Sequence, residues 1–353
     1  MTTTTYAGKQ ASILPSADPD WLAKRQEPIL EPDLPVIDPH HHLWDLPRQP
    51  RYLAEELLGD ATAGHNVRGT IFTDCTEAYR TEGPENMRPV GETEFVAAIA
   101  EASARGEYGP VALCAGIISY ADLREGESVA AVLEAHIEAG RGYFRGIRQS
   151  TAWDPHPEIR TTMRTPPQGL LLDPQFRKGF SRLAPLGLTF DSWVYHHQLS
   201  DVADLARSFP DTTIILDHVG GPIGIGPYAG RRDEVFAVWK EGILEVARQP
   251  NVSVKLGGLA MRLSGFGFHE RPEPPSSEDL AQTWRPYIET CIEAFGPHRA
   301  MFESNFPVDQ LSCSYAVLWN GFKRLAAGCS ASEKADLFAG TAARVYGLNG
   351  VLS

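Results

Sequence analysis

Short, mostly apolar runs alternate along the chain with longer stretches in which apolar residues recur every three or four positions. The short runs are typical of buried β-strands, and the longer stretches are typical of amphipathic helices. The pattern predicts eight strands, over Leu34–His40, Gly69–Cys75, Pro110–Ile118, Phe144–Gln149, Leu188–Tyr195, Thr212–Asp217, Asn251–Leu256 and Arg299–Ser304. It predicts helices between several of them, over Glu92–Ala104, Val129–Ala139, Pro174–Leu183, Leu199–Ser208, Glu234–Arg248 and Trp284–Phe295.

Strands that alternate with helices in this way favour a closed parallel (β/α)8 TIM-like barrel, with a doubly wound sheet as the alternative. We expect residues 36–353 to form this barrel as a single domain. Residues 1–35 are polar and rich in proline, and are expected to form an N-terminal arm with a short helix over Pro19–Arg25 capped by Asp18. The loops 219–230 and 257–277 follow the sixth and seventh strands, and so belong to the carboxyl end of the barrel, where barrel enzymes carry their active sites.

The overall composition excludes some classes of binding partner. The chain has 353 residues and a net charge of −13, which argues against nucleic acid and anionic membranes as partners because both require a basic face. No run of 18 apolar residues and no signal peptide is found, and the five cysteines form no CxxC pair, as expected for reduced thiols in a cytoplasmic protein. A small-molecule substrate is therefore expected, and a homo-oligomer is one expected assembly.

Histidines gather where the predicted strands end. In DPHHHLWD, at residues 38–45, alternation places His40 and His42 on one face and His41 on the other. The sixth strand ends in LDHVGGP, where alternation places His218 on the opposite face from Asp217. The fifth strand ends in two adjacent histidines, of which only one can point inward; the candidates are His196 and His197.

Other polar groups join these histidines at the carboxyl ends of the strands. Lys255 lies on the seventh strand, where it either pairs with Glu303 or reaches a substrate. Neutral imidazoles can bind a zinc-like ion that activates water, and a group of the eighth strand would then take the proton. Alternatively, cationic imidazoles together with Arg145 and Arg148 can bind a carboxylate substrate without a metal.

The segments DPHHHLWD, FRGIRQ, LDHVGGP, VKLGGL and ESNFPVD, in this order, resemble the amidohydrolase superfamily. The resemblance is to the amidohydrolase-2 branch, which includes sugar-lactone and 2-pyrone-4,6-dicarboxylate lactonases. It implies a distorted barrel that hydrolyses an ester, lactone or amide. It also implies that His40 and His42 are the first-strand pair, that His218 is the sixth-strand histidine, and that His196 or His197 is the fifth-strand metal ligand.

The chain departs from this family at the eighth strand. The family's Gly-Ser-Asp-Trp-Pro, whose Asp is the base, is replaced by residues 303–307, Glu-Ser-Asn-Phe-Pro. Asn305 stands in place of the Asp and cannot act as a base. Glu303, Asp309 or a histidine would have to replace it.

The sequence therefore predicts a hydrolase of a small lactone or amide, in which strand-end histidines assist water attack with or without a divalent metal. A metal-dependent decarboxylase of an aromatic or unsaturated acid is the alternative from another class, and a barrel that only binds a ligand is the third. Zinc is the expected metal and no nucleotide cofactor is expected, because the glycines of residues 220–230 are interrupted by prolines. The predicted metal ligands are His40, His42, His196 and His218; the catalytic candidates are His218, Glu303, Asn305 and Asp309; the substrate-binding candidates are Arg145, Arg148, Lys255, His197 and Trp44.

Overall fold

A computed structural model describes residues 18–45, 50–159, 164–348 and 350–352. It contains one eight-stranded sheet in which every strand lies next to its neighbour in the sequence, and all seven strand pairs are parallel. The strands are β1 (Pro35–His41), β2 (Asn66–Thr73), β3 (Ala112–Ser119), β4 (Phe144–Arg148), β5 (Thr189–Ser192), β6 (Ile214–Leu216), β7 (Val252–Leu256) and β8 (Ala300–Phe302). The predicted barrel is thus confirmed, and the doubly wound alternative is wrong because the strand order never reverses.

The barrel closes between its first and last strands at the carboxyl end. The amide of Asn305 donates to the His40 carbonyl at 2.9 Å, and the amide of His42 donates to the Phe306 carbonyl at 2.7 Å. Both bonds use the segment that follows β8. The first-strand histidines and the unusual eighth-strand segment are therefore brought together by the closure itself.

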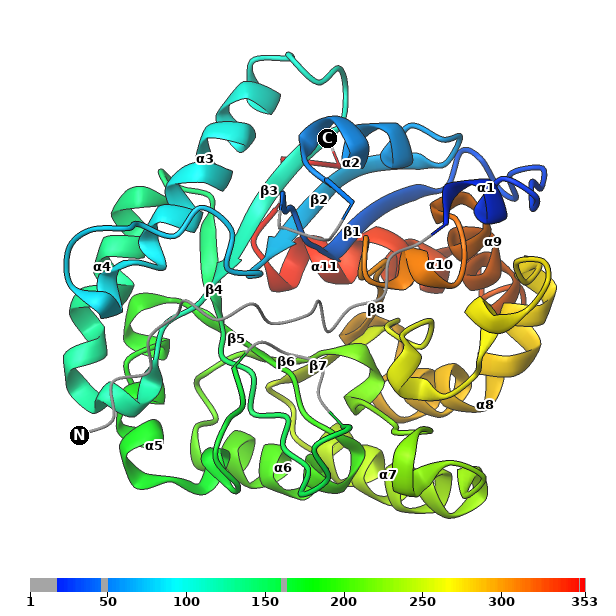
Figure 1. Ribbon diagram of the computed structural model, residues 1–353. Helices are drawn as coiled ribbons and strands as arrows, with labels where there is room; N and C mark the ends of the chain where they lie inside the picture. Colours follow the sequence, from blue (N-terminus) through cyan, green and yellow to red (C-terminus); the bar gives the residue numbers. More distant parts are fainter. Residues whose placement is uncertain (1–17, 46–49, 160–163, 349, 353) are drawn as a thin grey trace.

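Helices surround the barrel, as the ribbon shows (Figure 1). They are α1 (Pro19–Leu22), α2 (Ala54–Ala61), α3 (Val90–Ala104), α4 (Val129–Ala139), α5 (Pro174–Phe180), α6 (Leu199–Ser208), α7 (Arg232–Ala247), α8 (Ser277–Phe295), α9 (Tyr315–Leu325), α10 (Ala331–Ala335) and α11 (Thr341–Val345). The helix predicted from Trp284 begins earlier, at Ser277, because Ser276 and Asp279 form a capping box there. Helices α2, α9, α10 and α11 have no counterpart among the predicted ones.

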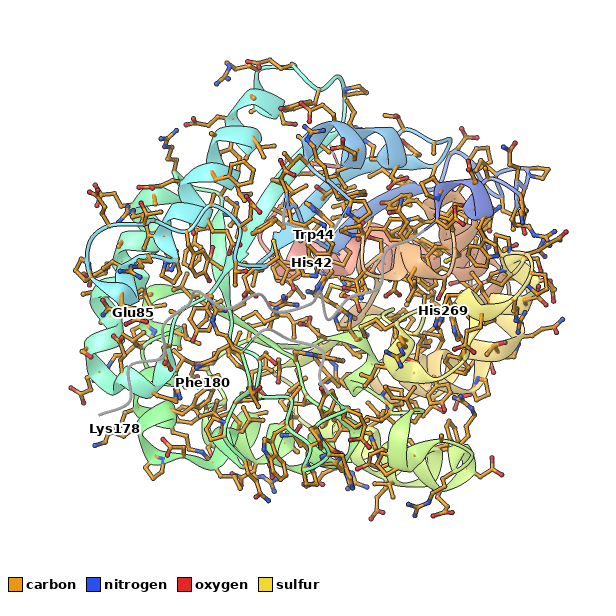
Figure 2. All side chains as sticks on the ribbon, viewed as in Figure 1. His42, Trp44, Glu85, Lys178, Phe180 and His269 are labelled. Atoms are coloured by element: carbon orange, nitrogen blue, oxygen red, sulfur yellow. The ribbon has the colours of Figure 1, made fainter. Side chains whose placement is uncertain are left out.

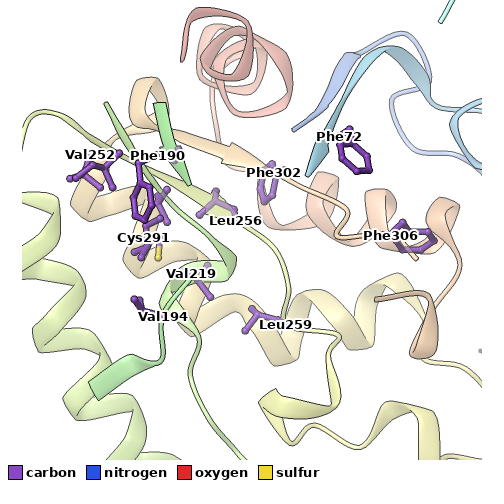
Figure 3. Packing of buried hydrophobic residues seen from close by; sticks show 14 of the residues in the cluster. Phe72, Phe190, Val194, Val219, Val252, Leu256, Leu259, Cys291, Phe302 and Phe306 are labelled. Carbon is purple, nitrogen blue, oxygen red and sulfur yellow. The ribbon is translucent and has the colours of Figure 1, made fainter. Parts of the chain in front are cut away.

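Alternate strand residues pack against the helices. Phe190, Val252, Leu256 and Phe302 belong to one buried cluster with Cys291 of α8, which Figure 3 shows from close by. All five cysteines are free thiols. Within the described ranges, no helix is both long and apolar enough to cross a membrane.

The intervening strand residues face the barrel interior, which is sealed at the amino end by the C-terminal segment. Ile37, Ile71, Ile215 and Met301, from β1, β2, β6 and β8, share a second buried cluster with Tyr346 and other residues of 339–348. The carboxyl end therefore remains for the functional site.

The described part of the predicted arm, residues 18–34, lies against the segment that leads into α8. Asp18 caps α1 as predicted, although the helix ends at Leu22 rather than Arg25. The indole nitrogen of Trp21 donates to the Arg271 carbonyl at 2.9 Å, and the Ser277 amide donates to the Glu27 carboxylate at 2.8 Å. The division of the chain at residue 35 stays a prediction.

Candidate active site

His40 lies in the middle of the carboxyl end and is fully buried. Its Nδ1 is 3.1 Å from the Lys255 ammonium and 3.1 Å from Glu303 Oε2, while its Nε2 is 3.2 Å from an Arg148 nitrogen. Lysine and arginine can only donate hydrogen bonds, so a cation faces each ring nitrogen. Burial lowers the pKa of His40 well below its usual range and Lys255 lowers it further, so the ring is neutral.

His218 and Glu303 form a buried pair. Glu303 Oε1 accepts a hydrogen bond from His218 Nδ1 at 2.7 Å and another from the His218 amide at 3.1 Å. Burial raises the pKa of Glu303, but His218 and His40 outweigh it and lower the value to about 2. The carboxylate thus fixes the His218 ring with Nδ1 protonated, and the imidazole lone pair is left on Nε2.

Two glycines allow this pair to form. A Cβ on Gly258, whose φ is +68°, would lie 2.5 Å from the His218 Cγ, and a Cβ on Gly257 would lie 2.4 Å from the Glu303 Cγ. The VKLGGL segment, in which β7 ends, therefore carries glycines because the backbone passes against both members of the pair.

His42 is held in the same tautomer as His218, but by a backbone carbonyl. Its Nδ1 lies 2.8 Å from the Thr73 carbonyl, which can only accept, so we assign the proton to Nδ1 and the lone pair to Nε2. Burial lowers the pKa of His42 well below its usual range, and the charge of Arg148 adds to the effect. The Trp44 ring stacks on it at 5.9 Å between centroids, and the two residues are adjacent near the centre of the barrel mouth in Figure 2.

Below His40, Lys255 sits in a fully buried ion cluster. Its ammonium is 2.5 Å from Asp191 Oδ2 and 3.1 Å from Asp217 Oδ1, and Tyr346 donates to Asp191 at 2.8 Å. Burial alone would lower the pKa of Lys255, but the two carboxylates raise it. Lys255 therefore pairs with Asp191 and Asp217 rather than primarily with Glu303, and its complete burial gives it the position of a supporting group instead of a substrate contact.

The two candidate arginines are placed at opposite ends of the barrel. Arg148 donates from Nε to Asp74 Oδ1 at 2.7 Å and also contacts His40, so it belongs to the site. Arg145 donates to the Gly142 carbonyl at 2.6 Å and lines a cavity of about 310 Å³ with Leu348 and its neighbours at the amino end. The prediction that Arg145 contacts substrate is therefore wrong, because the start of β4 carries its side chain away from the mouth.

Asn305 and Asp309 form a third buried pair. The side-chain amide of Asn305 donates to Asp309 Oδ1 at 2.7 Å, and the backbone amide of Ala260 donates to Asp309 Oδ2 at 3.2 Å. Burial raises the pKa of Asp309 to about 7, against smaller opposing contributions from its neighbours, which include the hydrogen bond from Asn305. A carboxyl group that titrates near neutrality thus stands next to the amide that replaces the family's Asp.

The fifth-strand histidines lie outside this arrangement. Strand β5 ends at Ser192, and the turn that begins α6 carries His196 and His197 to the rim, where His197 Nε2 bonds the Trp153 carbonyl at 3.0 Å. The residue that meets His218 from this strand is Trp193, at 4.8 Å between ring centroids. The prediction of a fifth-strand metal ligand is not supported by this placement.

The metal-ligand set predicted from four histidines does not assemble. Among the described residues one group could hold a metal ion, namely His40, His218 and Glu303. Two of these groups, His218 and Glu303, are already joined by a hydrogen bond of 2.7 Å, and the Lys255 ammonium lies 3.1 Å from His40 Nδ1, where it would repel a second cation. In this arrangement a divalent ion would have to compete with the hydrogen bond between His218 and Glu303 and with the Lys255 ammonium.

Three carboxylates of the site are not among the residues predicted from the sequence. Asp191 and Asp217 hold Lys255, and Asp74 holds Arg148. Asp191 did leave a signal, because it is a charge inside the apolar run LTFDSWV. Asp217 was assigned to the face opposite His218, whereas His218 has a left-handed backbone with φ of 54°, so both consecutive side chains reach the site.

The chain matches known proteins over almost its whole barrel. The amidohydrolase family model matches residues 37–348. An uncharacterized protein, y4mH of Sinorhizobium fredii, is 34% identical over 89% of this chain and 99% of its own length, and an L-fucono-1,5-lactonase of Burkholderia multivorans is 29% identical over 88% and 96%. The structure of an amidohydrolase of Burkholderia multivorans with bound zinc has a TM-score of 0.65 and 25% identity, over 88% of this chain and 99% of that one. The chain belongs to the amidohydrolase family and is a hydrolase.

Proposed function

We propose that the protein hydrolyses a lactone, with His218 as the general base. The observation that carries the proposal is the buried pair in which Glu303 Oε1 accepts from His218 Nδ1 at 2.7 Å. A carboxylate that fixes one ring nitrogen and leaves the other to take a proton is the arrangement by which hydrolases activate water or a nucleophile. The similarity to an L-fucono-1,5-lactonase supports a lactone rather than an amide.

In the proposed reaction, His218 Nε2 takes a proton from water as the water oxygen bonds to the lactone carbonyl carbon. The imidazolium that forms is stabilised by Glu303. The ring C–O bond then breaks, and Asp309, whose pKa burial raises to about 7, gives a proton to the departing oxygen. A proton passes from His218 back to Asp309, and the product is a hydroxy acid.

Arg148 and His42 complete the proposed site. Arg148 is held by Asp74 at 2.7 Å and by His40 at 3.2 Å, which leaves further N–H groups for the carbonyl oxygen as it becomes negative. His42 offers an unprotonated Nε2, because its Nδ1 is engaged by the Thr73 carbonyl at 2.8 Å. It would accept a hydrogen bond from the water or from a substrate hydroxyl.

The proposed reaction does not route any step through a metal ion. The zinc-bound structure belongs to a relative, and here the Lys255 ammonium lies 3.1 Å from His40 Nδ1. We expect protein dialysed against a chelator to hold less than about 0.1 equivalent of metal and to keep its full activity. Loss of activity that added zinc restores would contradict this part of the proposal.

The experiment that tests the function is a lactone panel with product analysis. Hydrolysis adds the mass of water to the substrate, whereas the alternative, decarboxylation, releases carbon dioxide. We expect Glu303→Gln to lower kcat roughly 10²–10⁴-fold while the circular dichroism spectrum is unchanged. Glu85→Gln, an exposed carboxylate on the surface labelled in Figure 2, is the matched control and should leave kcat as it is. Full activity of Glu303→Gln would overturn the proposal.

A further inference from the structure

One arginine outside the predicted site is built into the mouth of the barrel. The guanidinium carbon of Arg164 lies 3.7 Å from the centre of the Tyr120 ring and 5.4 Å from that of Tyr79. Its terminal nitrogen donates to the Tyr79 hydroxyl at 2.7 Å. Stacking on one ring and bonding to a second fixes a planar group that would otherwise move freely. The Arg164 side chain is nevertheless 30% exposed, so it can meet a ligand.

Arg164 is joined to the active site through a shared carboxylate. Its other terminal nitrogen is 3.8 Å from Asp74 Oδ2, while Arg148 holds Asp74 Oδ1 at 2.7 Å. Asp74 follows the end of β2 and Tyr120 follows the end of β3, which places the group at the carboxyl end of the barrel. Arg148 in turn contacts His40. Two guanidinium groups therefore stand side by side at the mouth, one on each oxygen of Asp74.

The neighbouring acid, Glu92, is occupied with the backbone. Its Oε1 accepts from the Cys75 amide at 3.0 Å and from the Glu77 amide at 2.8 Å, and the side chain is fully buried. Burial raises the pKa of Glu92 to about 8, and Asp74 adds to the shift. Glu92 thus supports the loop that carries Asp74 and adds little negative charge at neutral pH.

We propose that Arg164, together with Arg148, binds an anionic group of the substrate, and that the protein acts on lactones that carry a carboxylate. This inference rests on the proposed lactonase function and adds the substrate class. A guanidinium presents a planar fork of donors that matches a carboxylate, and a positive pair raises the local concentration of anions although the whole chain carries a charge of −13. A sulfonate or phosphate can also accept two hydrogen bonds from a guanidinium, so the experiment has to distinguish these anions from a carboxylate.

The test compares matched lactones with and without a carboxylate, at the same ring size. For the wild-type protein, kcat/KM should be at least tenfold higher for the carboxylated member. In Arg164→Gln, KM for the carboxylated lactone should rise about 10–100-fold, as expected for a lost charged hydrogen bond, while kcat changes less than about threefold. The same variant should leave KM for the uncharged lactone unchanged, and Arg164→Lys should recover part of the loss.

Two further variants keep the test decisive if Arg164→Gln folds poorly. Tyr79→Phe keeps the ring but removes the hydroxyl that Arg164 bonds, and should raise KM for the carboxylated lactone alone, by about threefold to tenfold. Arg145→Gln removes an arginine at the amino end and should change neither KM value. Sulfonated and phosphorylated lactones are tested as well. Equal KM values for the carboxylated, sulfonated and phosphorylated lactones would show that the site binds anions in general and does not select a carboxylate.

The two proposals fail in different ways. Turnover of uncharged lactones with kcat/KM equal to that of carboxylated ones, or an equal loss for both in Arg164→Gln, would overturn the carboxylate subsite and leave the lactonase function in place. Absence of turnover with every lactone would overturn the proposed function itself. Binding of a carboxylated, non-hydrolysable lactone analogue to Glu303→Gln, measured by calorimetry, would then still report on the subsite.

Discussion

The two ends of the barrel interior differ although the same strands build both. Near the amino end, Ile215 and Met301 belong to an apolar cluster that the C-terminal segment seals. Two residues further along the chain, directly after these strands end, Asp217 and Glu303 are also fully buried but carry charge. Because strand side chains alternate, a step of two residues keeps the face and changes only the residue type. From one layer of inward-facing side chains to the next, the interior thus changes from apolar packing residues to charged residues of the site.

The difference teaches how a barrel can bury charge at a functional site. At the carboxyl end a central buried ion has partners of opposite charge, as Lys255 has in Asp191 and Asp217. Such pairs contribute little net stability when complete, but they cost several kcal/mol when one member is removed. The apolar end has no such dependence, since a deleted methyl group leaves only a small cavity. The charged end should therefore be the fragile one.

Replacement of Lys255 should give the largest effect on stability. We expect Lys255→Met to lower the free energy of unfolding by about 3–5 kcal/mol, because Asp191 and Asp217 would remain buried without a cation. Urea denaturation followed by fluorescence measures it. The double variant Lys255→Met with Asp191→Asn should recover part of the loss. A loss below about 1 kcal/mol would mean that water or protonation already compensates the cluster.

Acid should destabilise the same end through Glu303. The pKa of Glu303 is about 2 in the folded protein, against its ordinary value of 4.5 when unfolded. The contribution of Glu303 is therefore present above pH 4.5 and is lost as the pH falls from there towards 2. At about 1.4 kcal/mol per pH unit, the full contribution is about 3 kcal/mol.

The measurement for this effect compares unfolding of the wild type and Glu303→Gln from pH 6 to pH 3. The difference between their free energies of unfolding isolates Glu303 from Asp38 and Asp191, whose pKa values burial raises to about 6. We expect the difference to shrink as the pH falls below about 4.5. A constant difference across this range would show that the Glu303 carboxylate gains nothing from His218 and His40.

The pair of Asn305 and Asp309 offers a smaller effect on the pH dependence of the rate. Asn305→Asp would place a second carboxylate beside Asp309 and remove the amide that donates to it at 2.7 Å. Two adjacent acids share one proton, so the pKa of Asp309 should rise from about 7 by about one unit. The alkaline limb of the kcat profile should move upward by the same amount. If the alkaline limb does not move, the group that causes it is not Asp309.

Much of the fold and part of the site could be predicted from the sequence. Strand alternation correctly placed His40 inside the barrel and His41 on the opposite face, where its ring meets Phe72. All eight strands were expected, because buried parallel strands appear as short apolar runs. The resemblance to amidohydrolases indicated that His218 belongs to the site. The replacement of the family's Asp by Asn305 indicated that another group takes over the acid–base role.

The rest depends on geometry that periodicity does not contain. His218 and Asn305 have left-handed backbones, with φ of 54° at each, so their side chains leave the strand direction that alternation predicts. Arg164 lies in a loop between β4 and α5, and at the mouth it contacts two tyrosines and Asp74 from other loops. A single sequence does not reveal which distant loops meet.

The smallest change in the free energy of unfolding is expected at the apolar end. It can be compared directly with the change expected at the charged end. Ile215→Val removes one methyl group from the cluster that the C-terminal segment seals, and should cost about 0.5–1.5 kcal/mol. Unlike the loss in Lys255→Met, this loss should be the same at pH 6 and pH 4, and kcat and KM should not change. Urea denaturation at both pH values, with steady-state kinetics beside it, provides the check. If Ile215→Val altered the pH dependence or the rate, the two ends would be coupled through the barrel interior, and the division between a packing end and a chemical end would be wrong.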